Sequence, residues 1–128
     1  MKKVVVTPEF GSYPRDWHFS PGIDTGDFVF FSGITGTRAD ASIAEDPETQ
    51  FRDAFRFLRA NLLQAGCTFS DVVDLTTYHL QLKRYLRAFM AVKDEFIVEP
   101  YPAWTAIGIS DLITDGALVE IRAVARHQ

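Results

Sequence analysis

Hydrophobic and polar residues recur along this chain with two distinct periods. A period of two places alternate side chains on opposite faces of a strand, and it predicts strands over residues 3–7, 27–33, 70–82, 104–109 and 117–126. Apolar residues spaced three and four positions apart predict helices over residues 46–66 and 84–97. Residues 9–25 are rich in Gly, Pro, Ser and aromatic residues and are expected to form a winding loop or a short edge strand. This order of elements is typical of the α+β class, with no linker dividing residues 1–128, and predicts a single domain.

The two faces of the predicted sheet are both apolar, although the helices can cover only one. In the strand over 27–33, Phe28 and Phe30 project to one face, while Val29 and Phe31 project to the other. Two amphipathic helices are too few to cover both faces of a sheet of five or six strands. The second face is therefore expected to be covered by further copies of the chain.

The strand that contains Trp104 has an unusual division of side-chain size. Trp104 shares one face with Ala106 and Gly108, while Thr105 and Ile107 lie on the other. A large aromatic ring in line with two small residues is compatible with the wall of a small pocket. It is equally compatible with tight packing around a core tryptophan.

Composition narrows the class of protein. The 128 residues are 47% hydrophobic and 23% charged, which is the balance of an ordinary globular domain and not of a disordered chain. The net charge of −4 disfavours a nucleic-acid partner, since phosphate binding needs a concentrated basic surface. Cys67 is the single cysteine, so an intramolecular disulfide and a multi-cysteine zinc site are excluded. No membrane span or signal peptide is recognisable, and we expect a cytoplasmic protein.

The histidines do not predict a metal site. His18, His79 and His127 are far apart in the sequence, and no local carboxylate pattern connects them. His79 is expected to be a core or interface group, and His127 to be solvated. His18 lies in the aromatic loop DWHFSPG, where a surface position and the rim of a ligand pocket fit equally well.

Glu120 is the carboxylate that most needs an explanation. It lies between Val119 and Ile121 in a strongly apolar strand, where a charge is costly unless it is paired or hydrogen-bonded. An ion pair with Arg122 and a pocket carboxylate positioned for proton transfer are both open interpretations. Lys93, beside Val92 in the second helix, is expected to face solvent.

Three segments carry a resemblance to a known family: HFSPGIDTGDFVFFSGITG, DPETQFRDAFRFLRANLLQAGCTFSDVVDLTTYHL and PAWTAIGISDLITDGALVEIRAVA. From His18 to the last strand, the chain resembles the Rid/YjgF family, whose members are often labelled translation inhibitors or endoribonucleases. The resemblance implies a chorismate-mutase-like mixed sheet with two helices on one face. It also implies a homotrimer with ligand clefts between subunits, and hydrolysis of small enamines and imines to keto acids and ammonia without a cofactor. In such clefts an arginine binds the substrate carboxylate, and a glutamate on the last strand orients or activates water.

The resemblance assigns roles residue by residue. Glu120 matches the glutamate and is the candidate catalytic residue. Trp104 stands where the family has its arginine, Phe19 where it has a tyrosine, and Lys93 where many members have asparagine. The candidate ligand-binding residues are then His18, Phe19, Ser32, Lys93, Trp104, Thr105 and Ala106. If the rest of the pocket is intact, Trp104→Arg is expected to restore a carboxylate clamp.

Three functions stay open on the sequence. The first is a divergent hydrolase of the deaminase type acting on a small imine, enamine or related metabolite, which retention of Glu120 favours. The second is a non-catalytic trimer that binds a metabolite or a partner, which Trp104 and Phe19 favour because an aromatic box needs no acid or base. The third is an endoribonuclease, which only the family label suggests.

Overall fold

The computed structural model describes residues 2–128, which form one six-stranded sheet, three α-helices and two 3-10 turns. In chain order the elements are β1 (Lys3–Val5), η1 (Pro8–Phe10), α1 (Tyr13–Trp17), β2 (Gly22–Asp24), β3 (Phe28–Phe31), α2 (Pro47–Gln64), η2 (Phe69–Asp71), β4 (Val72–His79), α3 (Leu82–Phe96), β5 (Ala103–Gly108) and β6 (Val119–Arg126).

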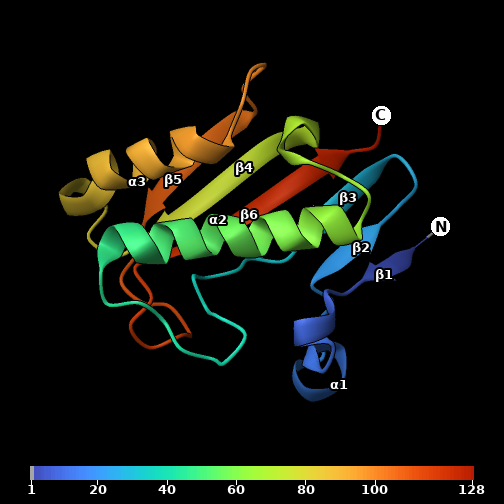
Figure 1. The fold of residues 1–128 in the computed structure, drawn as a ribbon, viewed down its shortest axis with the longest axis horizontal. Helices are drawn as coiled ribbons and strands as arrows, with labels where there is room; N and C mark the ends of the chain where they lie inside the picture. The colour runs from blue at the N-terminus through green and yellow to red at the C-terminus, as the bar shows by residue number, and fades with distance from the viewer. Residues whose placement is uncertain (1) are drawn as a thin grey trace.

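The sheet is mixed and has the strand order β1-β2-β3-β6-β4-β5. All neighbours pair antiparallel except β4 and β5, which are parallel because α3 crosses over between them. Figure 1 shows α2 and α3 on the same face of the sheet, with α3 beside β4 and β5 and the short α1 at the other end, near β1. This arrangement confirms an α+β fold with the two long helices packed on one face.

The capping signals of α2 act as the sequence predicts. The Asp46 carboxylate accepts a hydrogen bond from the Thr49 backbone N–H at 2.9 Å, and Pro47 occupies the first helical position. Gly66 follows the helix with a φ of +76°, a conformation that residues with a Cβ rarely adopt. Between the long helices, the rings of Phe55 and Phe96 stack with their centroids 5.3 Å apart.

Two expectations about element bounds are wrong. Residues 9–25 are not a winding loop, since they contain α1 and also β2, which is an interior strand between β1 and β3. The strand expected over 70–82 is limited to Val72–His79. It is shorter at its start because Thr68 and Asp71 form a capping box around a 3-10 turn, and at its end because Gln81 takes a left-handed conformation.

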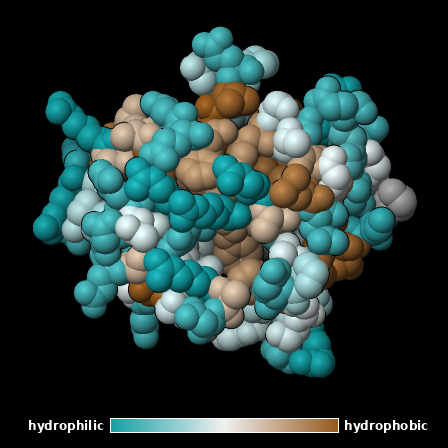
Figure 2. All heavy atoms as spheres, viewed as in Figure 1, coloured by the Kyte–Doolittle hydropathy of each residue, from teal (hydrophilic) through white to brown (hydrophobic). Residues whose placement is uncertain are grey.

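One face of the sheet carries apolar side chains that no helix of the described chain covers. Val29 and Phe31 are 0% and 1% exposed beneath the helices, whereas Phe28 and Phe30 are 37% and 42% exposed on the opposite face. Figure 2, which views the molecule from the side of α2, shows hydrophilic residues interspersed with hydrophobic ones on that face. No helix among residues 2–128 is both long enough and apolar enough to span a membrane.

Candidate functional site

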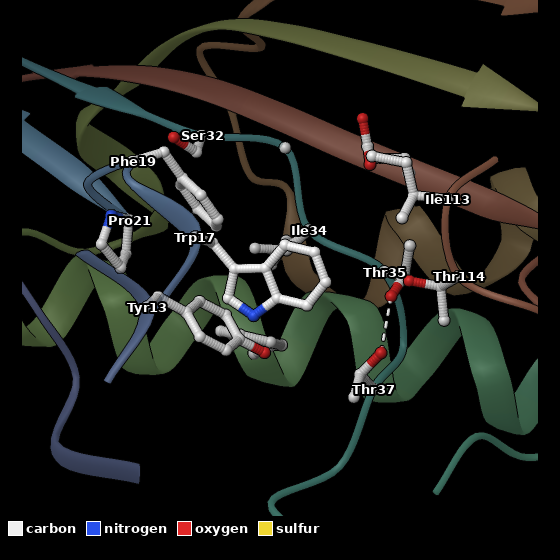
Figure 3. Close-up of a pocket in the computed structure, with 13 residues that line it drawn as sticks. Tyr13, Trp17, Phe19, Pro21, Ser32, Ile34, Thr35, Thr37, Ile113 and Thr114 are labelled. Atoms are coloured by element: carbon white, nitrogen blue, oxygen red, sulfur yellow. Dashed lines mark hydrogen bonds between the residues drawn. The ribbon is translucent and has the colours of Figure 1, made fainter. Parts of the chain in front are cut away.

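A cavity of about 350 Å³ lies where α1, the segment after β3 and the start of β6 meet. Its walls come mainly from aromatic and hydroxyl side chains. The lining residues are Tyr13, Trp17, Phe19, Pro21, Ser32, Gly33, Ile34, Thr35, Thr37, Phe57, Ile113, Thr114 and Glu120. Figure 3 shows Trp17 projecting into the space, with Tyr13 and Phe19 on one side and the threonines on the other.

The aromatic wall depends on the short helix α1. Pro14 near its start has a backbone angle that suits a first turn, and His18 ends the helix in a left-handed conformation with a φ of 58°. The turn at His18 brings Phe19 back toward Tyr13, and the two ring centroids lie 5.5 Å apart. His18 itself is exposed and is not among the residues that line the cavity.

Glu120 is the charged residue of the cavity wall. Its side chain is half-buried, and it makes no hydrogen bond or ion pair with any residue in 2–128. The pair with Arg122 that the sequence left open is therefore not formed, and Arg122 is exposed. Burial raises the pKa of the Glu120 carboxyl, because desolvation disfavours the charged form.

The Gly33 backbone approaches the Glu120 side chain closely. A Cβ at Gly33 would lie 2.5 Å from Oε2 of Glu120, so a larger residue there would displace the carboxylate from its observed position. The backbone bridge between Ile34 and Ile121 fixes this segment against β6. The Gly33 position therefore limits where the carboxylate can lie.

The hydroxyl groups of the wall are partly engaged within the chain. The Ser32 hydroxyl donates to the Ser20 carbonyl oxygen at 2.7 Å, and the Thr35 and Thr37 hydroxyls share a hydrogen bond of 2.7 Å. Ser32 is thus not a free donor toward the cavity.

Trp104 lies elsewhere, on the face of the sheet that α3 covers. The register pairs Trp104 with buried Leu75 and Ala106 with buried Thr77, whereas exposed Thr105 points to the opposite face. The indole Nε1–H donates to the Thr77 hydroxyl at 2.9 Å, and the ring centroid lies 6.3 Å from that of Phe89. Within one chain, the alternation of large and small residues along β5 therefore serves packing under α3.

Lys93 is not solvent-facing, contrary to expectation. Its side chain is 12% exposed, and Nζ lies 4.5 Å from the centroid of the Trp104 ring. The ammonium is attracted to the ring face, and Asp94 lies 3.8 Å away. Lys93 therefore belongs to the Trp104 environment.

A buried polar chain that the sequence did not predict lies beneath Trp104. The Thr77 hydroxyl contacts both the indole N–H and Nε2 of His79, the latter at 2.7 Å. His79 is 2% exposed and meets the Phe89 ring edge-on, and burial lowers its pKa to about 4. His79 is thus a neutral core group, as expected for it, and it fixes the hydroxyl that holds Trp104.

The residues singled out from the sequence consequently form two groups in one chain. Phe19, Ser32 and Glu120 line the cavity, whereas Lys93, Trp104 and Ala106 lie under or beside α3 at the β5 edge. The wall residues that sequence reasoning missed are Tyr13, Trp17, Thr35, Thr37, Ile113 and Thr114, and also Pro21, Gly33, Ile34 and Phe57. The aromatic run around His18 was a signal for the first two, but the threonines and Ile113 carried none. Among residues 2–128 no group of three His, Cys, Asp or Glu side chains is arranged to hold a metal ion.

Known proteins resemble this chain over most of its length. The family model described as Endoribonuclease L-PSP matches residues 14–127. The RutC family protein YjgH of Escherichia coli K12 is 41% identical over 109 residues, covering 84% of this chain and 82% of that protein. A 2-iminobutanoate/2-iminopropanoate deaminase of Dermatophagoides farinae is 27% identical over 111 residues, covering 83% of each. A solved structure of protein YJGH matches with a TM-score of 0.87 and 37% identity, covering 99% of this chain and 98% of the other. The chain therefore belongs to the Endoribonuclease L-PSP family, the Rid/YjgF group of the sequence resemblance, and shares its chorismate-mutase-like fold.

Proposed function

We propose that the chain forms a homotrimer in which the β5 edge of one subunit faces the Glu120 cavity of the next, and that this cleft hydrolyses a small imine or enamine. The observation that carries the proposal is the unpaired, half-buried carboxyl of Glu120 in a cavity with an aromatic wall. A carboxyl with a raised pKa and no structural partner is typical of a proton-transfer group. The exposed Phe28 and Phe30 supply an apolar surface for the subunit contact.

Subunit contact would explain why the candidate residues form two groups. Glu120 pairs with Tyr78 and Trp104 pairs with Leu75 on β4. Tyr78 and Leu75 are three residues apart, an odd separation, so Glu120 and Trp104 lie on opposite faces of the sheet of one chain. No movement within one subunit can bring the two side chains together across the sheet. A neighbouring subunit can place its β5 edge against the cavity.

Hydrolysis of an imine needs one group that accepts and then returns a proton. The Glu120 carboxylate removes a proton from a water molecule as the water oxygen bonds to the imine carbon and the C=N electron pair moves to nitrogen. Glu120 then returns the proton to nitrogen, which gives a neutral carbinolamine. In a second relay the carboxylate takes the hydroxyl proton and passes it to nitrogen as the C–N bond breaks, so that ammonia and the carbonyl compound leave. An enamine enters the same route after it is protonated on carbon to give the imine.

Substrates that carry a carboxylate are expected to be poor. The indole N–H of Trp104 is already donated to Thr77, and indole offers no second donor to replace the two-pronged grip of a guanidinium. The deaminase among the relatives acts on imino acids by its name. For this chain we propose the same reaction type with weak turnover of such anions.

The test compares wild-type protein with Glu120→Gln. The substitution keeps the shape of the side chain, so the melting temperature should hold, while ammonia release from an imine generated in situ should fall about 10²-fold or more. Glu48→Gln, at an exposed carboxylate on α2, is the matched control and should leave turnover unchanged. Normal turnover by Glu120→Gln would remove the catalytic role. The aromatic cavity would then favour a metabolite-binding module.

A further inference from the structure

We infer that the Glu120 cavity selects a cationic ligand without a carboxylate, an iminium or ammonium ion, in preference to the anion of an imino acid. The inference names the substrate class of the proposed site and rests on that proposal for the location of the reaction. It does not depend on hydrolysis, because it concerns only binding of the ligand.

Charge is the first reason. Among the thirteen residues that line the cavity, Glu120 is the one charged residue, and no Lys, Arg or His is present. The Glu120 carboxylate has no ion-pair partner among residues 2–128. An anion entering the cavity would meet an uncompensated like charge, whereas a cation would supply the missing partner.

The aromatic wall is the second reason. Tyr13, Trp17 and Phe19 gather on one side of the cavity in Figure 3, and Phe57 also lines it. The faces of such rings carry negative charge density and attract ammonium and iminium groups. Aromatic rings combined with a carboxylate are the usual elements of sites for organic cations.

The third reason is the lack of charged donors for a carboxylate. The hydroxyls of Tyr13 and Thr114 and the indole N–H of Trp17 donate to no residue in 2–128, but all three are neutral. Ser32 donates to Ser20, and either Thr35 or Thr37 spends its hydroxyl hydrogen on the other. A carboxylate needs several N–H or O–H donors when it leaves water. A cation needs acceptors instead, and Glu120 provides them.

The β5 edge that a neighbouring subunit would contribute does not reverse this preference. Lys93 is the cation near that edge, and its Nζ already lies over the Trp104 ring and near Asp94. The indole N–H of Trp104 points to Thr77. Neither Lys93 nor Trp104 therefore offers an anion a free charge or donor.

Binding of a matched pair of probes tests the inference. Choline and 3,3-dimethylbutan-1-ol have the same shape, but only choline is charged, and pyruvate represents the anionic class. Calorimetric titration of the full chain at pH 7.5 and low salt should show choline binding about tenfold or more tightly than its neutral isostere, with pyruvate weaker still. Tighter binding of pyruvate, or equal binding of choline and the isostere, would overturn the inference.

Three variants show whether the named residues produce the preference. Glu120→Gln should reduce the preference for choline over the isostere to about twofold or less, since it removes the charge and keeps the shape. Trp17→Leu should weaken the binding of choline severalfold and the binding of the isostere less, because the ring face attracts the positive charge that only choline carries. Glu48→Gln is the control and should bind as wild type does. An unchanged preference in Glu120→Gln would also overturn the inference.

Hydrolysis assays separate this inference from the proposed function. Imines generated in situ by an amine oxidase lack a carboxylate, whereas those generated from alanine by an amino acid oxidase carry one. Selective choline binding without hydrolysis of either imine would contradict the proposed function and support the cation site. Faster hydrolysis of the alanine-derived imine, without selective binding of choline, would contradict the cation site and support the proposed function.

Discussion

Trp104→Arg tests whether a carboxylate clamp can be restored by one substitution. The sequence resemblance alone predicts a gain of imino-acid hydrolysis. The structure predicts a loss of stability first, because the indole is held by Thr77, Phe89 and Lys93. The new guanidinium would also lie close to the Lys93 ammonium, with its like charge.

The magnitude follows from the contacts that disappear. A hydrogen bond such as that from Trp104 Nε1 to Thr77 contributes about 0.5–1.5 kcal/mol, and an aromatic contact such as that with Phe89 contributes a similar amount. The interaction of Lys93 with the ring adds about 0.5–1 kcal/mol at a partly exposed site. Trp104→Arg should therefore lower the free energy of unfolding by roughly 1.5–4 kcal/mol.

A second substitution distinguishes repulsion from lost packing. Adding Lys93→Asn to Trp104→Arg removes the like charge, so the double variant should recover about 1 kcal/mol or more relative to the single variant. Urea unfolding at one protomer concentration measures the free energy of unfolding of both variants. Ammonia release from an alanine-derived imine shows whether the new arginine binds the substrate carboxylate. We expect a gain of turnover in the double variant only. A single variant within about 0.5 kcal/mol of wild type would refute the account of Trp104 as a packed residue.

Three further predictions concern assembly, pH and the thiol. Light scattering should give a mass three times that of the 14.4 kDa chain, and Phe30→Glu should dissociate it; a stable wild-type monomer would contradict the trimer. His79 stays neutral in the fold down to about pH 4, whereas the unfolded chain takes up a proton near pH 6.5. The free energy of unfolding, measured with urea, should thus fall by up to about 3 kcal/mol as the pH is lowered from 6.5 to 4. His79→Gln should not show this loss, and identical pH profiles of stability for the two proteins would refute the prediction. Cys67 is 1% exposed and burial raises the pKa of its thiol, so a disulfide reagent should label it slowly until urea unfolds the chain; fast native labelling would contradict this.

The sequence predicted the elements that are specified by residues within the element or next to it. Helix α2 has its cap, its Pro47 and its terminal glycine in the sequence, and its bounds agree with the expectation within two residues at either end. Helix α1 has five residues and lacks an apolar stripe. Its surroundings depend on contacts distant in the sequence, such as the stack of Phe10 on Phe57 with centroids 4.1 Å apart. Pattern reasoning over a short window does not detect such contacts.

The same limit applies to the candidate site. Glu120 was noticeable because a carboxylate in an apolar strand conflicts with its neighbours, and the structure gives it no compensating partner in the described chain. For Trp104, alternation along β5 separated the two faces but did not say which face α3 covers. That choice depends on the parallel pairing of β5 with β4, where Trp104 is opposite Leu75. A pocket wall and a packed residue therefore could not be distinguished without the fold.

The positions that depart from the family resemblance all offer fewer hydrogen-bond donors to an anionic ligand. Where the resemblance implies a guanidinium, Trp104 has a donor that is committed to Thr77, and where it implies a phenol, Phe19 has a ring without a hydroxyl. Lys93 adds a charge, but that charge lies over the Trp104 ring and near Asp94. Each change removes or withholds a donor that an anion would use, while Glu120, which opposes an anion, is retained. A half-buried carboxyl without a partner is costly, and burial raises the pKa of Glu120, so a structural role does not account for it. The combination supports the proposal that Glu120 serves proton transfer in a site that accepts a cation and not an anion.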